Sequence, residues 1–239
     1  MNPSAACDGE GITRSPFLSV LMGLLNFRLG YWAPNPKQGW FRGWLRSPNY
    51  LLPGLCEVLF RNLLNEENPF IELSDGGHFE NLALYELVRR KAKLIIVCDG
   101  GADPHFTFSD LANAMEKVRT DFGAMILIES EQLKDLIPSQ EIDTIKVAEK
   151  AYLIATIKYA DSDYEGKLIY LTTTFCKKLS ADLYGYKKDN PSFPDQPTSQ
   201  QFFGETQFEA YRELGFQVAW DMMRDDAVTS IMGENAPRL

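Results

Sequence analysis

The sequence has few histidines and no closely spaced cysteines, and these two deficits exclude a common class of metal site. It contains 2 histidines, His78 and His105, and 4 cysteines, none of which forms a Cys-x-x-Cys pair. Zinc sites use Cys and His ligands at short spacings, so no metal site is predicted. A disulfide framework is not indicated either, because Cys98 lies in an apolar run where a reduced, buried thiol is expected.

The chain is also short of positive charge and of long apolar runs. Its 24 Lys and Arg residues against 33 Asp and Glu residues give a formal net charge of −9. This balance disfavours nucleic acid as a partner, since binding to phosphates requires a basic surface. The apolar stretch 17–27 is too short to span a bilayer. We therefore predict a cytoplasmic protein that does not bind nucleic acid, with attachment to a membrane surface left open.

Residues 70–104 contain the pattern around which the rest of the chain is interpreted. An extended apolar segment ends in Asp75, Gly76 and Gly77, and an amphipathic segment and a second apolar strand follow, ending at Asp99. This order predicts a strand, turn, helix, strand unit. The carboxyl ends of parallel strands form the ligand-binding edge of open α/β sheets, so Asp75 and Asp99 are candidate reactive residues.

The rest of the chain continues to alternate helix and strand patterns. Helical spacing over 111–122 follows a Thr107-to-Asp110 capping box and stops at Gly123, and a strand is predicted at 124–128. The extended segments 152–160 and 167–175 predict an antiparallel edge, and Gly166 suits the turn between them. A long helix with aromatic positions Phe202, Phe208, Tyr211 and Phe216 is expected to run towards Met223.

These elements predict an α/β fold of three layers, with a mostly parallel central sheet and helices on both faces. The length and the apolar content of 45% fit a single domain over residues 1–239. Residues 1–14 and 228–239 lack periodicity and are expected to be loose.

A segment rich in indoles and cations lies between residues 29 and 52. It contains Trp32, Trp40, Trp44, Arg42 and Arg46. Such a mixture is typical of a membrane interface, where amphipathic rings lie at the depth of the lipid headgroups. The alternative, an irregular cap that packs on the domain by its aromatic rings, is the more common arrangement for such a segment. Both interpretations are kept.

Asp75 is the candidate catalytic residue, because the two following glycines allow a ligand to approach its carboxylate closely. A desolvated carboxylate can accept the proton of a serine hydroxyl during acyl transfer. The same side chain can instead accept the free N–H groups of the helix that follows. Neither histidine has the local signature of a Ser-His-Asp triad. The Asp99 loop lacks the Lys-Ser/Thr of a phosphate loop, so it is a weak nucleotide-binding signal.

The string SDGGHFENLALYELVRRKAKLIIVCDGGADP, residues 74–104, resembles the Asp-Gly-Gly segment of bacterial patatin-like phospholipases. NFRLGYWAPNP upstream, and GKLIYL and FPDQPTSQQFFGETQFEAYRELG downstream, are similar to the same branch, so that the resemblance covers about residues 5–215. It implies a lipid acyl-ester hydrolase with a Ser-Asp dyad. Asp75 would be the aspartate of the dyad, Gly76 and Gly77 would support its turn, a lipid or other acyl ester would be the substrate, and no organic cofactor is implied.

The chain departs from the family pattern at the nucleophile. No serine has a glycine two positions before it, so Gly-x-Ser-x-Gly is absent, as is the glycine-rich oxyanion loop. The resemblance therefore implies the C-terminal portion of a patatin-like domain, truncated at its N-terminal side, inactive alone and able to associate with membranes through the missing part. The alternative is an inactive patatin-like remnant that binds lipid or protein.

Overall fold

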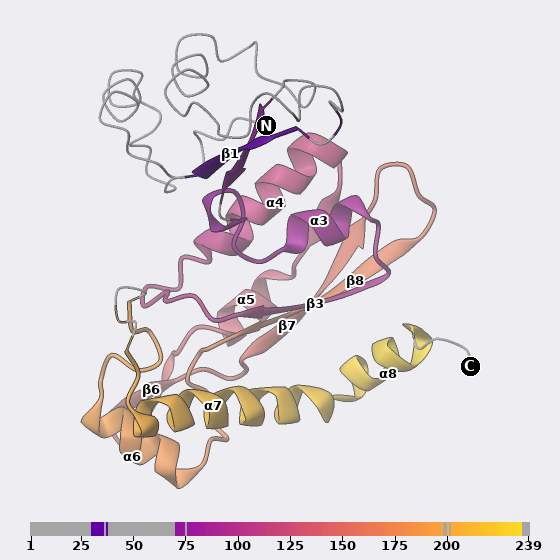
Figure 1. The fold of residues 1–239 in the computed structure, drawn as a ribbon. Helices are drawn as coiled ribbons and strands as arrows, with labels where there is room; N and C mark the ends of the chain where they lie inside the picture. The colour runs from indigo at the N-terminus through magenta and orange to yellow at the C-terminus, as the bar shows by residue number, and fades with distance from the viewer. Residues whose placement is uncertain are drawn as a thin grey trace. The chain divides into compact units, whose positions relative to one another are not determined.

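The computed structural model divides the chain into two compact units, Met1–Asn81 and Leu82–Leu239, and each is described by itself (Figure 1). The described residues are 30–35, 37, 70–74, 76–197, 200 and 202–235. The apolar stretch 17–27 and most of the indole-rich segment lie outside them. No helix within the described ranges combines the length and the apolar character needed to cross a bilayer.

The first unit contains a two-stranded antiparallel sheet. β1 (Gly30–Pro34) pairs with β2 (Phe70–Ser74), and Trp32 lies opposite Glu72 in the register. A 3₁₀ turn, η4 (Gly76–His78), follows β2. The predicted strand before the Asp-Gly-Gly turn is confirmed. The predicted pairing is wrong, because β2 and the next strand of the chain belong to different sheets.

The second unit is built on a four-stranded sheet in the order β3-β8-β7-β4. Its strands are β3 (Leu94–Asp99), β4 (Met125–Leu127), β7 (Tyr152–Lys158) and β8 (Glu165–Thr172). β3 and β8 are parallel, whereas β7 runs antiparallel to both β8 and β4. A separate antiparallel hairpin consists of β5 (Gln140–Ile142) and β6 (Ile145–Val147).

The second unit is therefore α/β in class, but its sheet contains both parallel and antiparallel strands. This corrects the expectation of a mostly parallel sheet. The segments 152–160 and 167–175 do form a hairpin, but it occupies the centre of the sheet instead of an edge. The reason lies in the composition of the hairpin. Both of its strands carry apolar residues on both faces, as strands that are covered on both sides require.

Helices cover both faces of this sheet, as expected (Figure 1). α3 (Leu84–Arg89) and α4 (Ser109–Phe122) pack together on one face, and α7 (Glu205–Met223) and α8 (Asp226–Asn235) lie on the other. Two shorter helices, α5 (Ser130–Asp135) and α6 (Ala181–Asp189), complete the unit.

Alternating residues of β8 supply the two halves of the core. Leu168 and Tyr170 alternate along the strand with Ile169 and Leu171, and all four are buried. The Ile169 side forms a cluster with Leu214, Val218 and Val228 of α7 and α8. This cluster corrects the expectation of a loose tail from residue 228, since Val228 is fully buried and α8 extends to Asn235.

Alternation also corrects the expectation for Cys98. Ile95 and Val97 of β3 point into the core, so Cys98 has the opposite orientation and is exposed. An uninterrupted apolar run does not show which of its faces is covered. Gly123, in contrast, ends α4 as predicted, with a φ of 62° and its N–H donated to the Arg119 carbonyl.

Gly166 is needed for a close approach within the sheet and not for the turn that the sequence suggested. It lies in β8 opposite Ile157, beside the Tyr159 hydroxyl, which donates a 2.6 Å hydrogen bond to the Ala92 carbonyl. A Cβ atom at Gly166 would lie 2.9 Å from that hydroxyl and 3.0 Å from the Ala92 carbonyl oxygen.

Gly166→Ala is expected to lower the free energy of unfolding by about 1–3 kcal/mol, because the new methyl group must displace the Tyr159 ring or the backbone. Gly185 is the matched control. It lies inside α6, where an added Cβ meets no atom within 4 Å, so Gly185→Ala should raise stability by about 0.5–1 kcal/mol. Chemical denaturation measures both, and equal effects would contradict the role assigned to Gly166.

Candidate functional site

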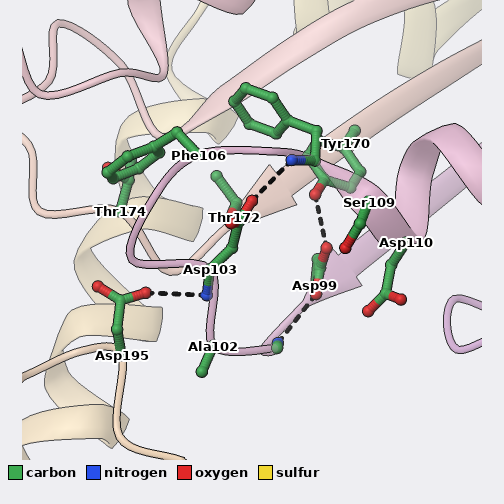
Figure 2. Close-up of a pocket in the computed structure, with 12 residues that line it drawn as sticks. Asp99, Ala102, Asp103, Phe106, Ser109, Asp110, Tyr170, Thr172, Thr174 and Asp195 are labelled. Atoms are coloured by element: carbon green, nitrogen blue, oxygen red, sulfur yellow. Dashed lines mark hydrogen bonds between the residues drawn. The ribbon is translucent and has the colours of Figure 1, made fainter. Parts of the chain in front are cut away.

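A polar pocket lies at the edge of the sheet where β3 and β8 end (Figure 2). The two strands are parallel, and Asp99 at the end of β3 lies opposite Thr172 at the end of β8. The loop from β3 to α4 and the segment around Asp195 complete the walls. This is the position at which open α/β folds bind ligands.

Asp99 is held by two hydrogen bonds, one to each carboxylate oxygen. Its Oδ1 accepts the Gly101 N–H at 2.9 Å, and its Oδ2 accepts the Tyr170 hydroxyl at 2.6 Å. Burial raises the pKa of Tyr170 above its ordinary value, and the hydrogen bond to Asp99 raises it further. The phenol is therefore a fixed donor that tethers the end of β3 to β8.

Asp103 fastens the start of α4. Its carboxylate accepts the N–H of Thr107 at 3.0 Å, the hydroxyl of Thr107 at 3.0 Å and the N–H of Phe108 at 2.7 Å. The predicted capping box is wrong, because α4 begins at Ser109 and its N-cap residue, Phe108, forms no side-chain cap. Burial opposes the ionisation of Asp103, but these donors outweigh burial and hold the pKa below its ordinary value.

Asp195 joins the pocket from a distant part of the chain. Its Oδ1 accepts the Asp103 N–H at 3.1 Å, across 92 positions of sequence. Burial raises the pKa of this half-buried carboxyl, and the hydrogen bond from the Asp103 N–H and the charge of Lys187 only partly oppose the rise. The pKa values of the two neighbouring carboxyls are therefore shifted in opposite directions, that of Asp103 below and that of Asp195 above its ordinary value.

The pocket is acidic and small. It is lined by Asp99, Gly101, Ala102, Asp103, Phe106, Phe108, Ser109, Asp110, Tyr170, Thr172, Thr174 and Asp195, and encloses about 30 Å³. That volume holds about one or two water molecules. Four carboxyl groups and no cation in this lining oppose a phosphate group, which disfavours the nucleotide interpretation. No group of His, Cys, Asp and Glu within the described ranges is arranged to hold a metal ion.

Asp75, the predicted catalytic residue, lies outside the described residues, between the end of β2 and the first residue of η4. Gly76 and Gly77 lie in η4 and are exposed. The Gly76 carbonyl accepts the N–H groups of Phe79 and Glu80, each at 2.9 Å. A Cβ at Gly76 would meet no atom within 4 Å, so the glycine leaves open space beside the turn.

The other predicted contact residues are not tested by the geometry. Trp32 lies on β1, where its backbone position is described and its side chain is not. Trp40, Trp44, Arg42 and Arg46 lie outside the described residues. Both interpretations of the indole-rich segment therefore stay predictions.

The pocket residues beyond the Asp99 loop were not found from the sequence. Tyr170 and Thr172 could have been found, had 167–175 been interpreted as a parallel neighbour of 94–99, since both strands end in polar residues. Asp195 carries no comparable signal, because it lies in a proline-rich segment whose position depends on tertiary contacts.

Comparison of the chain with protein-family models, with curated proteins and with solved structures gives no match. The resemblance to patatin-like phospholipases therefore depends on the sequence motifs alone.

Asp103→Ala is expected to lower the free energy of unfolding by about 1–2 kcal/mol near neutral pH, because two backbone N–H groups lose their acceptor. The folded pKa of Asp103 lies below its ordinary value of 3.8. Its contribution is thus present above that value and is lost as the pH falls through the folded pKa. Denaturation of both proteins between neutral and acidic pH should show the difference shrinking, and a pH-independent difference would contradict this role.

Asp195→Asn is expected to retain stability at neutral pH, because the amide oxygen can still accept the Asp103 N–H without a buried charge. The folded pKa of Asp195 lies above 3.8. The wild type therefore loses stability relative to Asp195→Asn as the pH rises from 3.8 through that folded pKa. Asp195→Ala, which lacks the acceptor, should be the less stable variant throughout, and equal stability of the two variants would remove Asp195 from its role.

Proposed function

We propose that this chain carries the aspartate of a Ser-Asp dyad in a patatin-like lipid acyl-ester hydrolase. The observation that carries the proposal is the Ser74-Asp75-Gly76-Gly77 motif, in which Asp75 separates the end of a strand from a 3₁₀ turn. The open space at Gly76 supports it, because a nucleophile or substrate must approach this turn closely.

In the proposed reaction, Asp75 accepts the proton of a serine hydroxyl as the serine oxygen bonds to the acyl carbon. The ester C–O bond then breaks, and the departing alcohol takes up the proton from Asp75. Water next attacks the acyl-enzyme and gives its proton to Asp75. The serine oxygen leaves with that proton, and the fatty acid is released.

The serine and the oxyanion donors are proposed to come from a segment outside this sequence, because no Gly-x-Ser-x-Gly occurs within it. The small pocket at Asp99 is not a substitute site, since about 30 Å³ cannot hold an acyl chain. The 239-residue chain by itself is therefore expected to hydrolyse no ester above the uncatalysed rate.

The test uses the natural gene product, meaning the protein that includes the segment proposed to supply the serine. In it, Asp75→Asn is expected to lower kcat for a short-chain aryl ester or a phospholipid by about 10²–10⁴-fold, the usual contribution of a general base. Asp99→Asn is the matched control, because Asp99 is also followed by two glycines but is bound by Tyr170 and Gly101. It should leave kcat within about threefold of the wild type, a small barrier change.

Equal activity of Asp75→Asn and the wild type would remove Asp75 from the mechanism. A natural gene product that hydrolyses no ester, but whose tryptophan fluorescence shifts on addition of phosphatidylcholine vesicles, would instead favour the lipid-binding remnant.

A further inference from the structure

The outer face of α7 carries large apolar side chains that the described residues leave uncovered. Phe208, Phe216, Trp220 and Met223 have exposed fractions of 65%, 54%, 58% and 44%. The buried residues of α7 occupy the opposite face, where the spacing Ala210, Leu214, Val218, Met222 packs on the sheet. A helix of 19 residues is about 28 Å long, so the outer face is an extended surface.

Two of these rings are already ordered against each other. Phe216 and Trp220 stack with a centroid separation of 6.0 Å and an interplanar angle of 22°. Because their rotamers are restrained by this contact, a partner that covers them loses less side-chain entropy than it would with free rings. The pair is thus a preorganised apolar surface and differs from a scattered set of exposed residues.

Two arginines, Arg212 and Arg224, lie in one row with these rings at intervals of four residues along α7. Arg212 forms hydrogen bonds of 2.9 and 2.8 Å to Glu209 and of 2.7 Å to Glu213. These contacts use N–H groups in the guanidinium plane and leave its flat face for stacking on an aromatic ring. Arg224 at the end of α7 is exposed and forms no ion pair among the described residues.

The row is self-complementary about Phe216. Residues 208, 212, 216, 220 and 224 are Phe, Arg, Phe, Trp and Arg. A two-fold axis through Phe216 places each residue opposite the one at the same distance on the other side. Arg212 then faces the partner's Trp220, Arg224 faces the partner's Phe208, and Phe216 faces itself, so that every guanidinium meets an aromatic ring.

We propose that the outer face of α7 is an isologous dimer interface between two copies of this chain. A crossing angle of about −50° between the two helices makes their i, i+4 rows parallel, so that the residues of one row can lie over those of the other. The arrangement gives two reciprocal Arg–Trp contacts and two reciprocal Arg–Phe contacts around the central phenylalanines.

A second copy fits this face better than an anionic membrane does. On the same side of α7 as the row, the helix carries Glu205, Glu209 and Glu213. Anionic headgroups would be repelled by this surface. The two-fold arrangement instead brings the guanidinium groups of each copy to the rings of the other.

The test is the dissociation constant of the dimer, measured by sedimentation equilibrium of the 239-residue chain from low to high micromolar concentration. Phe216→Glu puts two carboxylates together on the axis and should raise the dissociation constant at least about tenfold. Phe202→Glu is the matched control, because this ring is 93% exposed but precedes α7, and the dissociation constant should not change.

Exchanging the arginine and the tryptophan tests the proposed contact between Arg212 and the partner's Trp220. W220R places a second guanidinium opposite Arg212 and should weaken the dimer about tenfold, whereas R212W combined with W220R exchanges the two partners and should recover most of that loss. Circular dichroism confirms that each variant is folded.

Four results would overturn the proposal: a monomer at every concentration, an unchanged dimer in Phe216→Glu, an equal loss in Phe202→Glu, or no recovery in the double variant. A monomer that binds phosphatidylcholine vesicles through Trp220 would assign the face to a membrane instead. Ester hydrolysis is not part of this readout, so the dimer and the proposed hydrolase can fail separately.

Discussion

The parallel pairing of β3 with β8 is the constraint on which the polar edge of the second unit depends. Because the two strands run in the same direction, Asp99 and Thr172 end side by side, and the loops that leave them share one small space. Asp103 fixes the loop before α4, and Asp195 binds its backbone from the far end of the chain. The groups of this cluster form hydrogen bonds mainly with one another. The cluster therefore holds two loops together and leaves little space for a ligand.

The chain carries Asp-Gly-Gly twice, and the second copy shows why a short motif does not define chemistry. Both oxygens of Asp99 are engaged, one by the Gly101 N–H and one by the Tyr170 hydroxyl. Each oxygen is thus directed at a donor of the protein itself, so that the carboxylate holds the end of β3 to β8. The proposed catalytic role is given to Asp75 because the motif around it in the resemblance runs from Ser74 to Leu82, and because Gly76 leaves space beside its turn.

Local patterns in the sequence predicted most elements, whereas long-range pairing was not predictable. The helix that ends at Gly123, the strand at β4 and the hairpin of β7 and β8 follow from periodicity and turn chemistry within a few residues. The order of strands depends on contacts between distant segments, which periodicity does not encode, so the central position of the hairpin was missed. The same limit explains why the sequence did not indicate that Asp195 lies in the pocket. The role of Asp75 stays a prediction from its motif.

α7 shows how far the composition of a helix can mislead about its faces. Its aromatic positions suggest the side that packs, but the side that packs is made of Ala210, Leu214 and Val218, whose smaller size lets the helix lie close to the sheet. The larger rings are then left outside, where apolar area in contact with water raises the free energy of an isolated copy by about 25 cal/mol per Å². A face of this kind favours association in general. Arg212 and its two glutamates interrupt the apolar row, so that a partner without aromatic rings at matching positions must desolvate these charges without compensation. Specificity for a second copy therefore follows from the charges within the row, and affinity from the rings between them.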